Sequence, residues 1–202
     1  MKRRKFLTGS VVTASVLLMG INSCSTKDGK KVSEDNSVTK VDKLAGHSLE
    51  KLLEQYRYYL FDDFLPFMDK YVVDHKYGGF MCNTDRDGTN ITQNKTAWYE
   101  GRGIWVYSFL YNKLKKDPEY LEIARKSVEF ILKNEPSGDN LWPASFSREC
   151  KPISDPPNSI YGDLFVANGL SEYSQATGEE KYWNKAKAIL KRCMKIYNSP
   201  DY

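Results

Sequence analysis

Apolar residues recur every three or four positions in five stretches of the chain, the spacing that places side chains on one face of an α-helix. The first predicted helix spans residues 48–74, with Ser48 as its N-cap, and Pro66 is expected to kink or split it. Four more helices are predicted over 95–114, from Pro118 to Leu132, over 158–176 and over 179–197. Asp117 is the expected cap of the helix that Pro118 opens.

Short extended pieces are predicted in the segments that connect these helices. The run Asp85-Arg86-Asp87-Gly88 indicates a turn between the extended pieces Gly79–Asn83 and Thr89–Thr92. A second, irregular hairpin is expected in the loop 135–157, between Leu141–Phe146 and Cys150–Ile153. Asp85 and Asp87 could form the carboxylate pair of a glycoside hydrolase, but their place in a turn favours a turn-forming role.

The second and third predicted helices align with the fourth and fifth at a shift of 62 residues. Five residues keep their character at that shift, Tyr111, Tyr120, Ala124, Val128 and Leu132 matching Tyr173, Tyr182, Ala186, Leu190 and Met194. This period indicates a repeat of helical hairpins, although amphipathic helices can share such matches by chance. The repeat would recur only roughly two and a half times, so we expect the N-terminal part of a longer protein. The last helix should then expose Leu190, Cys193, Met194 and Ile196.

The first 24 residues have the pattern of an export signal. Four basic residues, Lys2 to Lys5, precede a mostly apolar stretch from Phe6 to Ile21, and the run Arg3-Arg4-Lys5-Phe6-Leu7 resembles the twin-arginine motif. Ile21-Asn22-Ser23-Cys24 resembles a bacterial lipobox, which predicts a lipid on Cys24; the alternative is a plain cleaved signal with an incidental cysteine. Residues 25–46 are expected to be a flexible tether before a domain at 47–202. We therefore expect an exported bacterial protein, lipid-anchored on the periplasmic or cell-surface side of a membrane.

Composition narrows the classes of function. The net charge of +4 comes from the N-terminal segment, and the 26 basic residues beyond it balance the 26 acidic ones, which argues against a nucleic-acid partner. A single long apolar stretch excludes a multi-span membrane protein. Cys82, Cys150 and Cys193 have no zinc-site spacing, and buried free thiols are the favoured interpretation. No metal site and no phosphate-binding loop is visible, so no cofactor is expected.

The segment 95–112 carries the strongest candidate chemistry. Trp98, Arg102, Trp105 and Phe109 lie at i, i+4, i+7 and i+11, on one stripe of a helix. The stripe could be structural, with the arginine stem packed on the rings and its head in solvent or on a carboxylate. It could instead line a pocket, where arginine supplies donors for hydroxyl oxygens and tryptophan a flat face for a sugar ring.

Several motifs, taken together, show a resemblance to a known family over about residues 48–198. They are Gly78-Gly79-Phe80, Asp85-Arg86-Asp87-Gly88, Lys95, Glu100-Gly101-Arg102, Trp105 and the later run Tyr161, Phe165, Gly169-Leu170, Glu172-Tyr173. Their order and spacing resemble the N-terminal region of the N-acylglucosamine 2-epimerase family, which includes cellobiose and mannobiose 2-epimerases. Glu100 stands where many members have glutamine, so the Gln-Gly-Arg form of the motif is not intact.

The resemblance implies an all-α fold of αα-hairpin repeats, part of an (α/α)6 toroid with short β-hairpins in its loops. The resemblance implies that Trp98, Arg102 and Tyr161 correspond to pocket residues of the family and that the partner is a mono- or disaccharide. The catalytic histidines of the family lie in the second half of the toroid, so they are expected beyond Tyr202. His47 and His75 match no catalytic position and are expected to have ordinary surface roles.

Three classes of function remain open from the sequence. The first is an epimerase or isomerase that moves a proton at sugar C2, present here as an incomplete chain that is inactive alone. The second is a surface glycan-binding lipoprotein without catalysis, and the third is a helical-repeat interaction protein in which Arg102 is structural. Pocket histidines in a further segment would favour the first, and sugar binding without turnover the second.

Overall fold

The computed structural model describes residues 41–200 and 202. The predictions for the signal peptide, for Cys24 and for most of the tether fall outside the described residues. The chain divides into two units, Met1–Val41 and Asp42–Tyr202, and the second is described here by itself. In the described part of the chain, no helix is both long and apolar enough to cross a bilayer.

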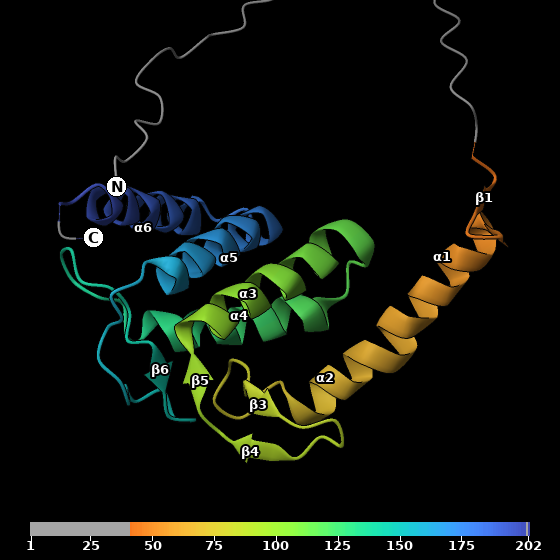
Figure 1. The fold of residues 1–202 in the computed structure, drawn as a ribbon, viewed down its shortest axis with the longest axis horizontal. Coiled ribbons are helices and arrows are strands. Elements are labelled where there is room, and N and C mark those ends of the chain that lie inside the picture. Colours follow the sequence, from red (N-terminus) through yellow and green to blue (C-terminus); the bar gives the residue numbers. More distant parts are fainter. Residues whose placement is uncertain (1–40, 201) are drawn as a thin grey trace, which may run out of the picture. The chain divides into compact units, whose positions relative to one another are not determined.

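The first predicted helix is present and continues through Pro66 without a break (Figure 1), but it contains a π-helical segment. A small hairpin, β1 (Lys43–Leu44) and β2 (His47–Ser48), leads into α1 (Leu49–Tyr58), a π-helical segment η1 (Tyr59–Phe64) and α2 (Leu65–Tyr71). Ser48 caps α1 as predicted, its hydroxyl accepting from the Lys51 amide at 3.3 Å. The wider π turn lies directly before Pro66, whose missing N–H cannot continue a regular α-helical ladder.

The turn at 85–88 forms as predicted between strands shorter than expected, β3 (Asn83–Thr84) and β4 (Asn90–Thr92). The carboxylate of Asp85 accepts from the Arg86 amide at 2.7 Å, and that of Asp87 accepts from the Thr89 amide at 2.8 Å. Gly88 closes the turn at φ +89°, a backbone conformation that favours glycine. Both aspartates are therefore turn formers, and the glycosidase pair is not supported.

The later loop forms a pairing that the sequence did not predict. Its strand β6 (Ser145–Phe146) pairs antiparallel with β5 (Lys95–Thr96), which belongs to the predicted helix 95–114. The expected irregular hairpin is also present: the Ser147 amide donates to the Lys151 carbonyl, the Ile153 amide donates to the Ser145 carbonyl, and Phe146 forms a bridge with Pro152. The helix prediction was thus wrong for residues 95 and 96, because their strand partner lies about fifty residues away and leaves no local signal.

The four remaining helices form two hairpins. They are α3 (Ala97–Phe109), extended by the π-helical η2 (Leu110–Leu114), with α4 (Pro118–Leu132), and then α5 (Tyr161–Thr177) with α6 (Glu180–Tyr197). Thr96 caps α3 and Asp117 caps α4, while α5 ends at Gly178 with φ +73°. The predicted all-α fold of helical hairpins with short strand pairs is confirmed.

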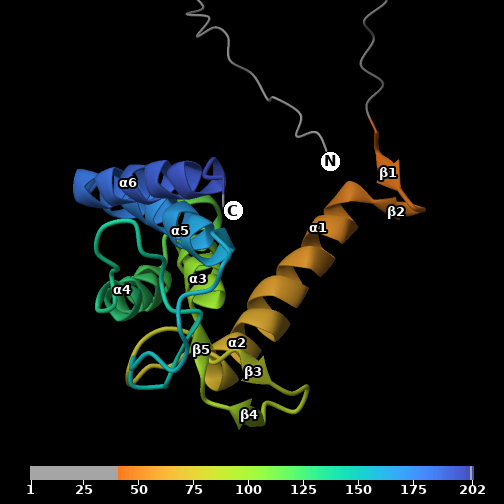
Figure 2. The same ribbon diagram turned by 60° about the vertical axis from the view of Figure 1, so that its left-hand side comes forward.

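The first helices of the two hairpins lie side by side, with α4 packed on α3 and α6 on α5 (Figures 1 and 2). Their backbones approach closely because glycine faces glycine: a Cβ on Gly169 would lie 2.5 Å from the Gly101 carbonyl oxygen. Buried apolar side chains fill the spaces between these helices, among them Ile104, Val128, Phe130 and Leu170. The α3–α5 pair is therefore the frame of the core.

The repeat is visible in matching ring contacts, with one correction. Tyr120 and Tyr182, equivalent in the repeat, meet a tyrosine of the preceding helix edge-on at interplanar angles of 61° and 70°. The partners are Tyr107 and Tyr173, so the alignment of Tyr111 with Tyr173 is one helical turn out of place. Tyr111 instead lies under the Lys116 ammonium.

Four residues of the last helix were predicted to be exposed, and the structure confirms this for two of them. Leu190 and Met194 are exposed, whereas Cys193 is buried and Ile196 is partly buried against the core. Cys193 lies on the helix face of Ala186 and Ile189, which packs inward. Cys82, Cys150 and Cys193 are free thiols, as predicted, and Cys150 and Cys193 are buried, whereas Cys82 is only partly buried.

Candidate functional site

The three predicted pocket residues lie together around one cavity of about 960 Å³. Trp98 and Arg102 come from the first half of α3, and Tyr161 is the first residue of α5. The remaining lining residues come from the strand pairs, the loop before α5 and the starts of α3 and α5: Cys82, Asn83, Thr92, Asn94, Thr96, Tyr99, Ala144, Ser145, Pro157, Ser159 and Gly162. The hairpin loops thus form one end of the cavity and the N-terminal ends of α3 and α5 the other.

One aromatic residue that the pocket prediction did not include organises this surface. Phe165 stacks on Trp98 with ring centroids 5.4 Å apart and an interplanar angle of 8°. The Arg102 guanidinium lies 5.7 Å from the same Phe165 ring, a cation–π contact. Phe165 lies one helical turn after Tyr161, and this i, i+4 spacing is the signal that could have identified it.

The head of Arg102 is exposed, and it has no ion pair or hydrogen bond to any residue that the structure describes. The structural interpretation allowed the arginine head to lie in solvent, as it does here, so the contacts of Arg102 fit both interpretations of the stripe. The second half of the stripe does not line the cavity, since Trp105 stacks on Phe109 at 4.9 Å instead. The pocket end of the stripe is limited to Trp98 and Arg102.

Neutral polar groups surround the rings. Asn83, Asn94, Thr92, Thr96, Ser145 and Ser159 bring amides and hydroxyls to the wall. Such groups both donate and accept, as the hydroxyls of a sugar require. Burial raises the pKa of the Cys82 thiol to about 11, so this wall residue is a neutral thiol at pH 7 and not a nucleophile.

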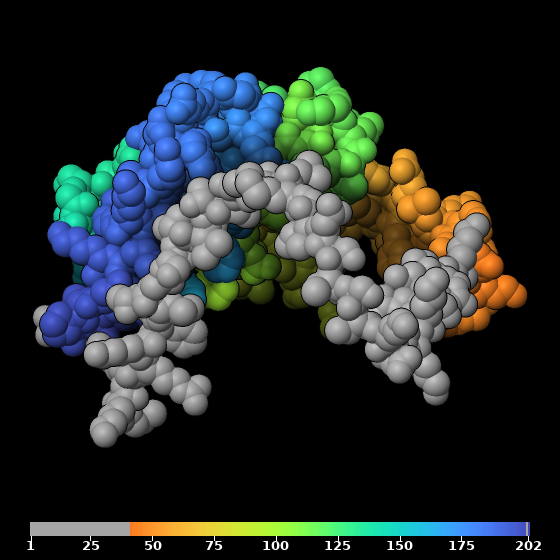
Figure 3. All heavy atoms as spheres, turned by 90° about the horizontal axis from the view of Figure 1, so that it is seen from above, coloured from red at the N-terminus to blue at the C-terminus, as the bar shows by residue number. Residues whose placement is uncertain are grey.

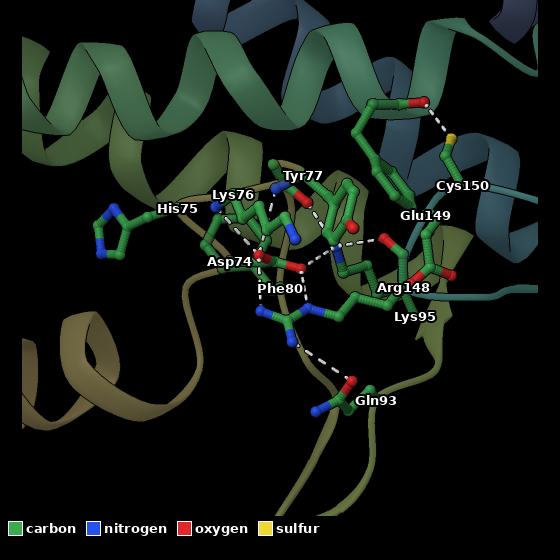
Figure 4. A network of polar contacts seen from close by, with 12 residues as sticks. Asp74, His75, Lys76, Tyr77, Phe80, Gln93, Lys95, Arg148, Glu149 and Cys150 are labelled. Carbon is green, nitrogen blue, oxygen red and sulfur yellow. Dashed lines mark hydrogen bonds and ion pairs between the residues drawn. The ribbon is translucent and has the colours of Figure 1, made fainter.

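A buried ion cluster lies beneath the strand pair β5–β6 (Figure 4). The Lys95 ammonium, fully buried, donates to the Asp74 carboxylate at 2.9 Å and to the carbonyls of Gly78 and Arg148 at 2.6 and 3.1 Å. The Arg148 guanidinium also binds Asp74, at 2.8 and 3.2 Å. The cluster ties the Gly78 turn and the Arg148 loop to the strand that precedes Trp98.

The charges in this cluster determine the ionisation state of the Asp74 carboxylate. Burial alone would raise the pKa of Asp74, but hydrogen bonds from Arg148 and Lys95 outweigh it and hold the pKa well below its usual range. Asp74 is therefore ionised in the folded protein. From the sequence, Lys95 could be identified only as part of a motif, and Asp74 and Arg148 could not be connected to it, because the three residues lie far apart in the chain.

The three residues of the Glu100-Gly101-Arg102 motif point in different directions, as successive helix positions must. Arg102 faces the cavity, and Gly101 faces α5, where a Cβ would meet the Phe165 backbone at 2.3 Å. Glu100 points inward, fully buried, and accepts from the Phe80 amide at 2.9 Å and the Ser127 hydroxyl at 2.7 Å. Glu100 is therefore a core residue and is not part of the cavity wall.

Both histidines of the chain lie outside the cavity lining, and both are exposed. The His75 ring contacts the Asp69 carboxylate at 2.9 Å, and His47 belongs to the β1–β2 hairpin. The prediction of surface positions for both is confirmed. Among the described residues, no group of three or more histidine, cysteine, aspartate or glutamate side chains could hold a metal ion.

Paired helical hairpins with short strand pairs between them define an αα-hairpin repeat fold, and comparison with known proteins gives its family. The sequence model of the N-acylglucosamine 2-epimerase (GlcNAc 2-epimerase) family matches residues 78–202. The chain belongs to this family, and the resemblance inferred from its motifs is confirmed.

The match to relatives of known function covers only part of the length of each relative. An N-acylglucosamine 2-epimerase from Bos taurus is 27% identical over 121 residues, which cover 58% of this chain and 28% of the relative. A cellobiose 2-epimerase from Dictyoglomus turgidum is 30% identical over 131 residues, 63% of this chain and 32% of the relative. The chain thus spans about a third of the length of the curated relatives it matches.

Solved structures agree with the fold. A sugar epimerase from a ruminal bacterium superposes with a TM-score of 0.64 at 25% identity, covering 71% of this chain and 37% of that one. A cellobiose 2-epimerase from Bacillus thermoamylovorans gives a TM-score of 0.62 at 22% identity, with the same coverage. The partial (α/α)6 toroid predicted from the sequence is therefore confirmed as the fold class.

Proposed function

We propose that the cavity at the ends of α3 and α5 binds a sugar, and that this chain supplies the sugar-holding part of an epimerase site acting at C2. The observation that carries the proposal is the exposed Arg102 guanidinium beside the stacked Trp98–Phe165 pair, with no carboxylate partner among the described residues. A flat aromatic face accepts a sugar ring, and a guanidinium donates to adjacent oxygens. The volume of about 960 Å³ leaves room for a mono- or disaccharide.

Arg102 has a specific task in such a reaction. Removal of the C2 proton from an open aldose gives an enediolate, whose negative charge is shared between C2 and O1, next to the O2 hydroxyl. A fixed guanidinium near those oxygens stabilises that charge more than it stabilises the neutral sugar, and so lowers the barrier. The proposed role of Arg102 is to hold O1 and O2, with Trp98 and Tyr161 placing the rest of the sugar.

Proton transfer needs groups that this wall does not contain. The described lining residues include no histidine, aspartate or glutamate, and the Cys82 thiol has a pKa of about 11, too high for a base near neutrality. We therefore assign binding and charge stabilisation to this cavity, and expect the proton-transferring side chains from outside it. The chain as given should bind a sugar without epimerising it.

Arg102→Ala should weaken sugar binding by the full chain about 10- to 100-fold, the loss of a charged donor pair worth about 1.4–2.8 kcal/mol. Arg102→Lys should recover only part of the loss, because an ammonium cannot replace a two-pronged donor. The measurement is titration with mannose, N-acetylglucosamine and cellobiose, followed by protein NMR shifts and by sugar NMR for C2 epimerisation.

Arg86→Ala is the matched control, because Arg86 is also exposed and lies in the 85–88 turn, outside the cavity lining. It should bind as the unaltered chain does. Equal affinities for the Arg102→Ala variant and the unaltered chain would contradict the proposed role. Epimerisation by the chain alone would contradict the assignment of proton transfer to groups outside the cavity.

We also propose that the protein is anchored to a membrane by a lipid on Cys24, on the basis of the pattern from Ile21 to Cys24. Cells fed a labelled fatty acid should incorporate the label into the unaltered chain, and Cys24→Ala should abolish it. Ser25→Ala is the neighbouring control and should keep the label. Labelling that persists in the Cys24→Ala variant would refute lipid attachment at this residue.

A further inference from the structure

A buried ion pair connects α6 to the start of α5, next to the cavity but outside its lining. Asp163, the third residue of α5, is 1% exposed, and the Arg192 guanidinium donates to one of its carboxylate oxygens at 2.7 Å. Helix α6 packs on α5 on the side away from α3 (Figure 1), and it lies at the surface of the unit in the space-filling view (Figure 3). The pair therefore brings a positive charge from α6 to the residues that directly follow the cavity wall.

The other oxygen of the Asp163 carboxylate holds a second segment. It accepts from the Trp142 amide at 3.2 Å, and Trp142 is itself 1% exposed. The Trp142 indole N–H donates to the Ile131 carbonyl at 3.1 Å, and the Arg192 guanidinium lies 5.2 Å from the indole ring, a cation–π contact. One carboxylate thus fixes the start of α5, helix α6 and the segment around Trp142 relative to one another.

Both segments that Asp163 holds lead directly into the cavity wall. Tyr161 and Gly162, immediately before Asp163, line the cavity. Residues 144 and 145, shortly after Trp142, line it as well. The hydrogen bond from the Trp142 amide therefore sets how far these two sides of the wall lie from each other.

The segment after Trp142 also contacts the start of α3. The Ala97 amide donates to the Ala144 carbonyl at 3.2 Å, and Trp98 is the next residue. A displacement of the Trp142 segment would therefore move Ala144 and loosen its contact with α3. Because a binding site must hold its groups to within about 0.5 Å, such a displacement should weaken binding of a sugar.

Stability alone gives little reason for this ion pair. A buried pair of opposite charges is often no more stable than well-packed apolar residues of similar volume, because both charges lose their hydration. The Nε atom of Arg192 is also buried, and it has no hydrogen-bond partner among the described residues. A carboxylate that a guanidinium holds does, however, offer an acceptor in a fixed direction, and an apolar residue offers none.

We propose that Asp163, held in place by Arg192, is a positioning residue of the sugar cavity. By accepting from the Trp142 amide, it keeps the two sides of the wall at the distance that sugar binding needs. Asp163 is not among the residues that line the cavity, so it acts only through the residues that it holds. The inference rests on the sugar binding proposed above.

The test compares two paired variants of the full chain carrying Cys24→Ala, so that no lipid is attached. Asp163→Leu with Arg192→Met and Asp163→Asn with Arg192→Met both remove the buried charges, but only asparagine keeps an oxygen that can accept from the Trp142 amide. In NMR titrations with mannose, N-acetylglucosamine and cellobiose, the leucine pair should bind about tenfold more weakly than the asparagine pair. The asparagine pair should bind as the unaltered chain does. Hydrogen exchange of the Ala97 amide, measured without sugar, should be about tenfold faster in the leucine pair.

Asn112→Leu is the matched control for a general loss of stability. The Asn112 side-chain amide donates to the Glu172 carboxylate and carbonyl at 2.7 and 3.2 Å, at the end of the α3–α5 pair away from the cavity. This variant should lower the thermal transition and leave both the sugar affinity and the Ala97 exchange unchanged. Weaker sugar binding in the control as well would mean that affinity follows stability alone, and it would overturn the positioning role.

The same measurements separate failure of the positioning role from failure of the proposed function. If the unaltered chain binds a sugar and the leucine and asparagine pairs bind it equally, the positioning role is wrong and sugar binding stands. Unchanged exchange of the Ala97 amide in the leucine pair would also overturn the positioning role. If the unaltered chain binds none of the three sugars, the proposed function is wrong, and the positioning role is wrong with it.

Discussion

Asp74→Ala is expected to lower the free energy of unfolding by about 3–5 kcal/mol, the usual cost of leaving one buried charge without its partner. The substitution would strand the Lys95 ammonium, which is 0% exposed and has no other carboxylate within ion-pair distance among the described residues. It would also remove the acceptor of the Lys76 and Tyr77 amides. Since domains of this kind are stable by only about 5–15 kcal/mol, urea unfolding of the full chain should show the loss directly.

A double-mutant cycle distinguishes the stranded charge from simple loss of packing. Lys95→Met alone should also destabilise, but in the Asp74→Ala chain it should restore stability, because it removes the unpaired charge beside the Phe130 ring. Asp69→Ala is the surface control: its pair with His75 is about half exposed, so the cost should be at most about 1 kcal/mol. Additive losses in the double variant would contradict coupling between Asp74 and Lys95.

Lowering the pH should reproduce the destabilisation expected of Asp74→Ala. Because the pKa of Asp74 lies well below its ordinary value of 3.8 in the folded protein, its contribution is present above that value and is lost as the pH falls through the folded pKa. The same cluster positions the wall of the cavity, since β5 leads directly to the Thr96 cap and Trp98. Stability and site geometry therefore depend on the same three side chains.

The helices were predictable because their signals are local. Ser48 and Asp117 cap the helices that they were expected to cap, and Gly178 ends α5 in the gap between the predicted helices 158–176 and 179–197. Trp98 and Arg102 could be placed on one face from their spacing of four residues alone. Tyr161 could be connected to them only through the family resemblance, because it lies in the second helical hairpin.

The parts that were missed depend on distant residues. Lys95 meets Arg148 across 53 positions, and the β5–β6 pair joins similarly separated segments, so neither leaves a periodic pattern. Leu49, Leu53 and Tyr56 of α1 have the predicted helical spacing and are exposed, because periodicity shows that an apolar face exists but not whether a partner covers it. The stacked ring of Phe165 was part of the family motif, yet only the packing of α3 on α5 placed it between Trp98 and Arg102.

Glu100 gives the protein a second and opposite dependence on pH. Burial raises the pKa of its carboxyl from an ordinary value of 4.5 to about 7, although hydrogen bonds from the Phe80 amide and the Ser127 hydroxyl act in the other direction. The folded protein therefore keeps this proton to a higher pH than the unfolded chain does. Stability from this group is complete below about pH 4.5 and falls as the pH rises to about 7, by about 3 kcal/mol in all.

Glu100→Gln should remove this slope, because the amide keeps an oxygen acceptor for the Phe80 amide and has no charged form. At pH 5 the variant should be about as stable as the unaltered chain, and at pH 8 it should be more stable by about 2–3 kcal/mol. Urea unfolding of both chains at the two pH values gives the four free energies, and the contributions of all other titrating groups cancel between the chains. Parallel pH profiles of the two chains would contradict a raised pKa of Glu100 in the folded protein.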